Sequence, residues 1–238
     1  MFDALFTTTT EYKKLSYALS GKGACALFGL PASGRAQVYA ALCRQLDKPL
    51  CIVTPGEAEA TRFAADLNTL GIPAAVFPAR DYVLRPIEGT AREYEYRRLA
   101  VLGELVGGRL RAVAVPAEAL TQFTTPKEDF CANTRTLHAG DTLLRDDLLA
   151  ALFGAGYTRR AQVDGPGQFS VRGDIVDIFA PDQKMPVRME FWGDEIDTLH
   201  TFDLTTQRRE DAIDKFYLSP AREVLFGKPA DAAERSEE

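Results

Sequence analysis

The sequence predicts an α/β protein with two parts, a parallel sheet covered by helices and a small α+β domain rich in antiparallel strands. In residues 1–132, short apolar runs alternate with longer segments of helical periodicity, which is typical of parallel strands buried on both faces. In residues 167–208, apolar and polar residues alternate one by one between clusters of Gly, Pro and Asp. That alternation indicates short strands with one buried face.

The elements of the first part follow from the same two patterns. Strands are expected where apolar residues run together between Gly, Pro or polar residues, at 24–30, 50–54, 74–77 and 111–115. Helices are expected in the longer amphipathic segments between them, at 12–19, 34–46, 57–70 and 91–106. The segment ARDYVLRPIEGT, residues 79–90, combines Pro, Gly and mixed charges. It is therefore expected to be a loop.

The character of the chain changes near Pro126, where a second domain is expected to follow. Residues 133–139 indicate its first strand, and residues 146–153 an amphipathic helix that ends at two glycines. After the strands of 167–208, a strand-like segment is expected to return towards the first domain, followed by an Ala-rich acidic tail that does not fold alone. The expected division is 1–132, 133–217 and 218–238.

The strand expected at 186–192 carries the most distinctive surface pattern. Three apolar side chains alternate there with Arg188, Glu190 and Trp192, so these three share the opposite face. The run 169–172 alternates in the same way and places Arg172 on a polar face. Arg and Trp are the residue types that most often anchor protein interfaces. From the residues alone, it stays open whether the two polar faces coincide.

A second candidate site lies where the first expected strand turns into a helix. Residues 29–36, GLPASGRA, have the glycine spacing of the P-loop pattern GxxxxGK[ST], with Gly29 and Gly34 in place and Ser33 in the loop. Arg35 and Ala36 stand where a P-loop has the Lys that reaches the phosphates and the hydroxyl that holds magnesium. The sequence therefore predicts a degenerate P-loop on a RecA-like nucleotide-hydrolase sheet, without ATP or another cofactor. An active P-loop of unusual sequence is the alternative.

Charge and hydropathy exclude several other functions. The formal charge of −6 argues against a stand-alone nucleic-acid binder, because affinity for DNA comes largely from neutralising phosphates with Lys and Arg. No apolar run is long enough to span a bilayer, and residues 1–14 lack the pattern of a signal peptide. The expected location is cytoplasmic, away from any membrane.

Cysteine and histidine give no sign of metal or redox chemistry. The four cysteines show no CxxC spacing and sit in apolar runs, so all are expected to be buried thiols; they are Cys25, Cys43, Cys51 and Cys131. His138 and His200 lie in expected strands with no Ser or Cys motif to serve. Packing or surface positions are expected for both, with no catalytic residue and no metal.

Three runs in the second part carry a family resemblance: VRGDIVDIF from 171, PVRMEFWGDEID from 186 and FDLTTQR from 202. Together they resemble the small β-rich domain shared by the bacterial excision-repair protein UvrB and the transcription-repair coupling factor (Mfd) family. The resemblance implies a docking surface for the damage-recognition ATPase UvrA, with Arg172, Arg188 and Trp192 at its matching positions. Related sequences have Phe where this chain has Trp192, so an aromatic side chain is kept. Glu190 is expected to orient Arg188 or to meet a basic group of the partner.

The resemblance extends to the first part and covers roughly residues 20–226. LFGLPASGRAQVYAAL, from residue 27, stands where UvrB has a working P-loop, and residues 79–90 stand where UvrB has a long DNA-inserting hairpin. Mfd is the family in which both features are lost. The resemblance therefore implies a non-catalytic adaptor that recruits UvrA to stalled transcription complexes during nucleotide excision repair.

The resemblance also implies a larger parent protein. That protein would be an ATP-dependent DNA translocase, meeting RNA polymerase and DNA through domains absent from this chain. Its C-terminal domain would mask the UvrA-facing surface in the resting state. Two alternatives stay open from the sequence, an ATP-dependent helicase or ATPase half and a DNA-binding repair scaffold.

Overall fold

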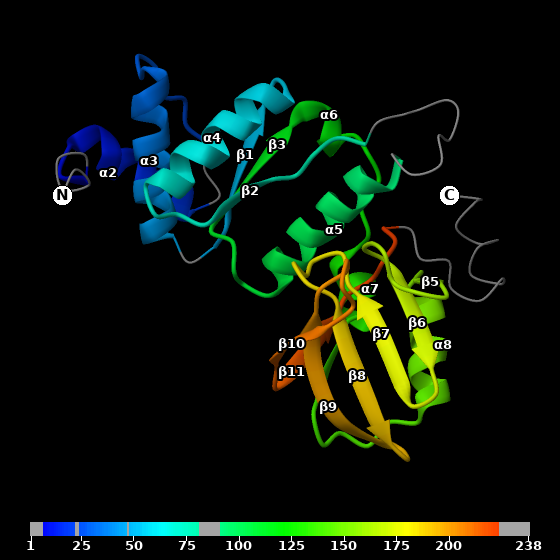
Figure 1. The fold of residues 1–238 in the computed structure, drawn as a ribbon. Helices are drawn as coiled ribbons and strands as arrows, with labels where there is room; N and C mark the ends of the chain where they lie inside the picture. The colour runs from blue at the N-terminus through cyan, green and yellow to red at the C-terminus, as the bar shows by residue number, and fades with distance from the viewer. Residues whose placement is uncertain (1–6, 22–23, 47, 81–90, 224–238) are drawn as a thin grey trace. The chain divides into compact units, whose positions relative to one another are not determined.

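The computed structural model describes residues 7–21, 24–46, 48–80 and 91–223 (Figure 1). Contacts divide the chain into two compact units. Unit 1 comprises residues 1–79 and 107–122, and unit 2 comprises residues 80–106 and 123–238. Most of the loop expected at 79–90, and the tail expected after 223, lie outside the described residues.

Unit 1 is built on three parallel strands in the order β1-β3-β2, as the sequence predicted for this part. The strands are β1 (Leu50–Thr54), β2 (Ala74–Val76) and β3 (Ala112–Pro116). The helices are α2 (Thr10–Ser20), α3 (Ala32–Gln45), α4 (Glu57–Thr69) and the short α6 (Ala117–Leu120). Helix α4 presents buried Ala60, Phe63, Ala64 and Leu67 at helical spacing to the core that contains Ile52 of β1.

The strand expected at 24–30 does not form, so that prediction is wrong. Leu27 is 46% exposed and Phe28 is 87% exposed. The run is apolar, but much of it is Ala, Cys and Gly, and only Phe28 belongs to the β-branched and aromatic types that are enriched in strands. In the described residues β1 is consequently an edge strand of the sheet.

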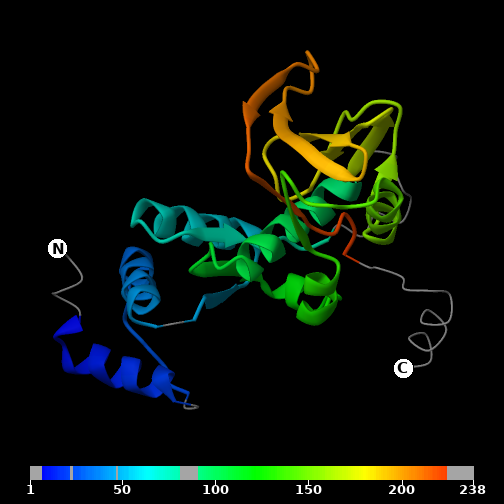
Figure 2. The same cartoon turned by 90° about the horizontal axis from the view of Figure 1, so that it is seen from below.

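Unit 2 is organised around a six-stranded sheet in the order β10-β9-β8-β7-β6-β5 (Figures 1 and 2). Its strands are β5 (Thr158–Arg159), β6 (Gln168–Arg172), β7 (Ile175–Phe179), β8 (Val187–Trp192), β9 (Glu195–Phe202) and β10 (Arg209–Ala212). All neighbours are antiparallel except β5 and β6. The predicted antiparallel character is confirmed. Strands β4 (Arg135–His138) and β11 (Lys215–Leu218) form a separate antiparallel pair.

Three helices complete unit 2: α5 (Ala91–Val106), α7 (Lys127–Ala132) and α8 (Arg145–Gly154). Leu148 and Leu152 of α8 are fully buried in the main core, together with Phe169, Met189 and other residues of one sheet face. The opposite face has only a small apolar cluster of Val163, Phe179, Phe202 and Leu204. One face of the sheet therefore packs into the main core, and the other carries mostly polar residues.

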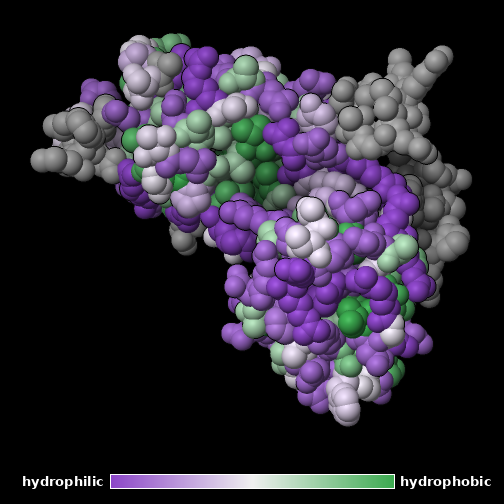
Figure 3. Space-filling model, viewed as in Figure 1, coloured by the Kyte–Doolittle hydropathy of each residue, from purple (hydrophilic) through white to green (hydrophobic). Residues whose placement is uncertain are grey.

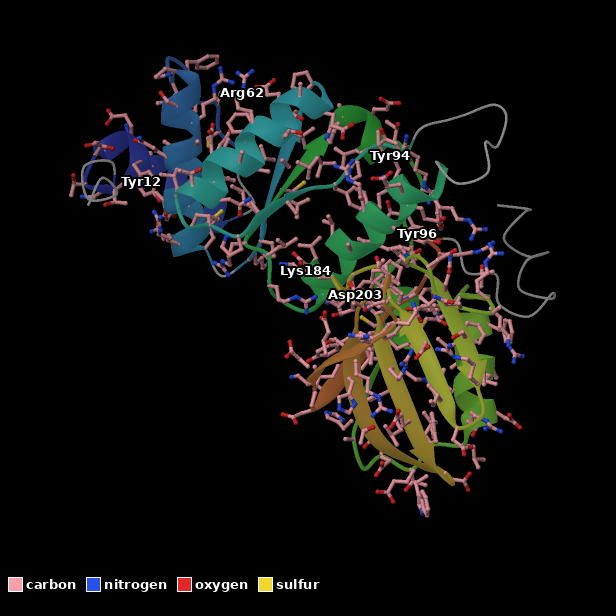
Figure 4. All side chains as sticks on the ribbon, viewed as in Figure 1. Tyr12, Arg62, Tyr94, Tyr96, Lys184 and Asp203 are labelled. Carbon is pink, nitrogen blue, oxygen red and sulfur yellow. The ribbon has the colours of Figure 1, made fainter. Side chains whose placement is uncertain are left out.

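Helix α5, expected within the first domain, belongs to unit 2. Tyr96 projects from this helix (Figure 4) and closely approaches Gly167 before β6, where an added Cβ would lie 2.6 Å from the phenol oxygen. Gly167 also has φ +72°, a conformation that disfavours other residues. The close approach explains why a glycine stands at the start of β6.

The segment from Ser219 to Glu223 is fastened along unit 2 by hydrogen bonds. The Tyr157 hydroxyl donates to the Ser219 carbonyl at 2.7 Å, and the Ala221 N–H donates to the Ala155 carbonyl at 2.8 Å. Burial raises the pKa of Tyr157 well above its usual value, so this hydroxyl remains a neutral donor. The segment ends in a carboxylate, Glu223, whose side chain is fully buried.

Glu223 is held by two arginines. Arg98 of α5, itself fully buried, binds both carboxylate oxygens, with Nε 2.8 Å from Oε2 and Nη2 2.8 Å from Oε1. Arg80 lies 2.8 Å from Oε2. Arg98 also donates to the Phe123 carbonyl at 3.2 Å and to the Thr124 hydroxyl at 2.9 Å. This set of residues, the Glu223 cluster, ties α5 and the 123–124 segment to the end of the described chain.

Two further expectations can be compared with the described residues. Cys43 is buried, as predicted, and burial raises its pKa, but Cys25, Cys51 and Cys131 are exposed, so the prediction of buried thiols is wrong for those three. Cys51 is exposed because it lies on the edge strand β1. Among the helices that the structure describes, none combines the length and the apolarity needed to cross a membrane.

Candidate functional site

The polar residues of β6, β7, β8 and β9 share one face of the six-stranded sheet. Ser170 pairs with Asp177, Asp177 pairs with Arg188, and Arg188 pairs with His200. Directly paired residues point to the same side of a sheet, so the polar faces expected around 169–172 and 186–192 coincide. The polar face, as defined here, comprises Ser170, Arg172, Ile175, Asp177, Arg188, Glu190, Trp192, Thr198 and His200.

Space-filling colours agree with this assignment. In the view of Figure 1, β6 to β9 face the viewer and α8 lies behind the β6 side of the sheet. Figure 3 shows that the surface over these strands is largely hydrophilic, with small hydrophobic patches. The side of the sheet that faces α8 supplies the main core instead. The polar face is thus an outer surface of unit 2 within the described residues.

A buried carboxylate occupies the middle of the polar face. Asp177 lies on β7 with its side chain fully buried, and its Oδ2 is 2.5 Å from Nη2 of Arg172 on the neighbouring β6. Its Oδ1 accepts from Nε of Arg188 on β8 at 2.7 Å, and its Oδ2 accepts from Nη2 at 3.0 Å. One carboxylate therefore joins arginines from both flanking strands. This set of three residues is called the Asp177 cluster below.

Arg188 is the more enclosed of the two arginines, with a side chain that is 11% exposed. Its Nη1 donates to the Gln207 carbonyl at 3.2 Å, and its guanidinium carbon lies 4.8 Å from the centre of the Phe202 ring. Gln207 has φ +60°, an uncommon conformation for a residue other than glycine. The hydrogen bond to Asp177 raises the pKa of Arg188, with burial acting in the opposite sense. Arg188 is accordingly a fully charged but internal group.

The outer part of the polar face is formed by Arg172 and Trp192. The Arg172 side chain is 47% exposed although it is paired with Asp177. Trp192 is 82% exposed and ends β8 just before Gly193, whose φ of +64° makes the turn into β9. A tryptophan so exposed on a folded domain is a candidate anchor for a partner.

Glu190 has a partner that the sequence did not suggest. It forms an ion pair with Arg209 of β10, and its Oε2 accepts from the Thr198 hydroxyl at 3.3 Å. The side chain of Glu190 is 20% exposed, and that of Arg209 is 47% exposed. Glu190 therefore orients Arg209, and the polar face gains a second half-exposed guanidinium.

Sequence reasoning missed Asp177 and Arg209 as members of this site. An acidic residue in the middle of IVDIF is a signal for a buried, paired charge, because Asp is almost never fully buried alone. This signal could have identified Asp177 from the sequence. Arg209 lies on a strand whose register with β9 is irregular, so no alternation pattern marks it.

The residues of the degenerate P-loop lie in a different setting from a phosphate cradle. Helix α3 begins at Ala32, so Ser33, Gly34, Arg35 and Ala36 are helical, and only Gly29 precedes the helix with φ +81°. The Arg35 N–H donates to the Pro31 carbonyl at 3.1 Å, and the Arg35 side chain lies 3.7 Å from Glu59. Ala36 is buried in the unit 1 core. Among the described residues no strand leads into this turn.

Comparisons with known proteins bear on the polar face directly. The family model of the UvrB interaction domain matches residues 136–224, which include β5 to β11 and all of β4 except Arg135. Several transcription-repair-coupling factors match, among them that of Bacillus subtilis with 28% identity over 213 residues and that of Myxococcus xanthus with 35% over 209 residues. These alignments cover 89% and 83% of this chain but only 18% and 17% of the relatives.

A protein of the excision-repair system itself is also similar. UvrABC system protein B of Chlorobium limicola is 28% identical over 217 residues, covering 85% of this chain and 32% of that protein. The resemblance expected from the sequence is confirmed by these matches together. The chain belongs with the UvrB-homology modules of transcription-repair coupling factors, and residues 136–224 are its UvrB interaction domain.

Proposed function

We propose that this chain is a non-catalytic adaptor module of transcription-coupled nucleotide excision repair, and that its polar face binds UvrA and recruits it to stalled transcription complexes. One observation carries the proposal. Within the UvrB interaction domain, Arg172 and Arg188 are gathered on one outer face by Asp177, and the exposed Trp192 lies on the same face. Arginine and tryptophan are the usual anchors of protein interfaces.

The test is capture of UvrA by purified chain carrying substitutions at exposed positions. Arg172→Ala and Trp192→Ala truncate side chains that are 47% and 82% exposed, so the fold should tolerate them. We expect each to weaken UvrA binding at least about tenfold, the loss of one interface anchor, with an unchanged circular dichroism spectrum. Arg135→Ala, at an exposed arginine of β4, is the matched control and should bind normally. Undiminished binding by the Arg172→Ala, Trp192→Ala double variant would remove this site assignment.

We propose that unit 1 is a degenerate P-loop domain of RecA-like descent that does not hydrolyse ATP. The proposal is supported by Arg35 and Ala36 at the decisive positions and by the engagement of Arg35 with Glu59. We expect no magnesium-dependent ATP turnover by the purified chain. Turnover that disappears on Arg35→Ala substitution would establish the ATPase alternative, and a strongly salt-dependent affinity for duplex DNA would establish the DNA-binding scaffold.

Further proposals concern a longer protein containing this chain. We propose that such a protein is an ATP-dependent DNA translocase that meets RNA polymerase and DNA through other domains, and that its C-terminal domain covers the polar face at rest. This chain alone would then bind UvrA more tightly than the longer protein does without polymerase and DNA. Equal affinities of the two proteins would contradict the masking.

A further inference from the structure

We infer that Asp177 is a positioning residue that makes Arg172 and Arg188 one unit, in which Arg172 meets the partner and Arg188 acts through Asp177. The inference rests on the proposed function, since it assigns roles within the surface that would bind UvrA. It differs from the simplest interpretation of the sequence, in which both arginines contact the partner directly.

The hydrogen bonds of Arg188 support an internal role. Its Nε, Nη1 and Nη2 all donate within unit 2, to Asp177 and to the Gln207 carbonyl, and its side chain is 11% exposed. Its guanidinium also lies over the Phe202 ring at 4.8 Å. These bonds use three of its five N–H donors, and the side chain is so enclosed that little of it is accessible to a partner carboxylate. Arg188 is therefore occupied in the folded chain.

Arg172 is placed differently. In the described residues only its Nη2 is engaged, by Asp177, and its side chain is 47% exposed. A guanidinium has five N–H donors in a fixed fork, so Arg172 has donors that its bond to Asp177 does not use. An acidic group of the partner can pair with them, and a guanidinium can grip a carboxylate through two donors at once.

The position of Asp177 explains how the two arginines are coupled. It lies on β7, between the strands that carry Arg172 and Arg188, and its fully buried carboxylate cannot reach a partner. Arg188 fixes both carboxylate oxygens, and the carboxylate in turn fixes Arg172. Holding a long side chain in one geometry before binding lowers the entropy cost of binding.

Asp177→Asn separates this inference from simple electrostatics by the sign of its effect. Removing a negative charge beside two arginines should tighten binding to an acidic partner if only net charge matters. If Asp177 positions Arg172, the same substitution should weaken UvrA binding, by about tenfold for residues coupled through one network. Thermal unfolding of each variant, measured alongside, shows that the domain is folded during the binding assay.

A double-mutant cycle completes the test, with UvrA affinities measured by calorimetry for the wild-type chain and variants. In the Arg172→Ala background, Asp177→Asn should change UvrA affinity less than about twofold, because its effect passes through Arg172. Arg188→Lys should weaken UvrA binding as a single substitution but have little further effect in the Arg172→Ala background. It keeps the charge but cannot fill the fork geometry, and it supplies a second cycle if Asp177→Asn fails to fold. Arg135→Ala is the control.

The outcomes distinguish the two levels of the proposal. A wild-type chain that does not bind UvrA would remove the proposed function, and this inference with it. Wild-type binding with independent, additive effects of the substitutions, or tighter binding by Asp177→Asn, would overturn the positioning role alone.

Discussion

Unit 2 contains two fully buried carboxylates, each held by two arginines, and they differ in what the arginines face. In the Glu223 cluster, Arg98 is fully buried and hydrogen-bonded inside the unit, and Arg80 is 29% exposed. In the Asp177 cluster, Arg188 is internal but Arg172 is 47% exposed. The same chemical pairing can therefore fasten segments of a fold together in one place and present a charge to solvent in another.

The difference is also one of chain separation. Asp177 joins neighbouring strands of one sheet, with partners 5 and 11 residues away in sequence. Glu223 reaches Arg98 at a separation of 125 residues and Arg80 at 143. Loss of the Glu223 cluster should thus affect how distant segments are held together, whereas loss of the Asp177 cluster should affect mainly the surface that it supports.

Glu223→Ala should have the largest effect on stability. It leaves the fully buried Arg98 without its counter-charge, and breaking a buried pair in this way costs about 3–5 kcal/mol. For a chain of 238 residues this corresponds to a fall in Tm of about 10 °C. Thermal denaturation followed by circular dichroism measures it. Glu128→Ala, at an exposed position of α7, is the matched control, and an equal effect of both substitutions would contradict a fastening role for Glu223.

Asp177→Ala should have an intermediate effect on stability, about 1–3 kcal/mol. The buried carboxylate is lost, but Arg172 is half exposed and can be solvated, and Arg188 keeps its hydrogen bond to the Gln207 carbonyl and its contact with the Phe202 ring. The penalty should therefore be smaller than for Glu223. Urea denaturation gives the free energy of unfolding for comparison with Glu223→Ala. A destabilisation larger than that of Glu223→Ala would reverse the ranking of the two clusters.

Arg172→Ala should change stability least, by about 0–1 kcal/mol, as is usual for pairs with an exposed member. It should nevertheless weaken UvrA binding at least about tenfold, the behaviour of an interface anchor. Measured side by side, a substitution at Arg172 should lower UvrA affinity with little change in Tm, whereas a substitution at the fully buried Arg98 should lower Tm. A large fall in Tm for Arg172→Ala would mean that it is a structural residue like Arg98.

Much of the architecture was predictable because it depends on local patterns. The helix expected at 91–106 has those bounds, and the alternation of 186–192 correctly put Arg188, Glu190 and Trp192 on one face. The strand predicted at 24–30 is absent because that run is apolar but has few side chains that favour strands. The expected domain boundaries at 132 and 217 remain a prediction; a fragment cut there would lack Arg98 and Glu223.

The site was only partly predictable, because its connections depend on strand register and on tertiary contacts. Nothing local in the sequence fixes that Asp177 pairs with Arg188, or that Glu190 meets Arg209 from beyond a turn. The exposure of Arg172 and the enclosure of Arg188 depend in the same way on Gln207 and Phe202. Residue type and periodicity predicted which face carries the site. The role of each residue on that face could be assigned only from the three-dimensional structure.

The buried carboxylate of Asp177 has a consequence for the speed of partner encounter. It cancels one of the two arginine charges beside it, and the chain as a whole carries a formal charge of −6. Long-range steering towards an acidic surface should therefore be weak, because steering needs an extended field of one sign. We expect substitutions at Arg172 to shorten the lifetime of a complex while leaving its association rate nearly constant.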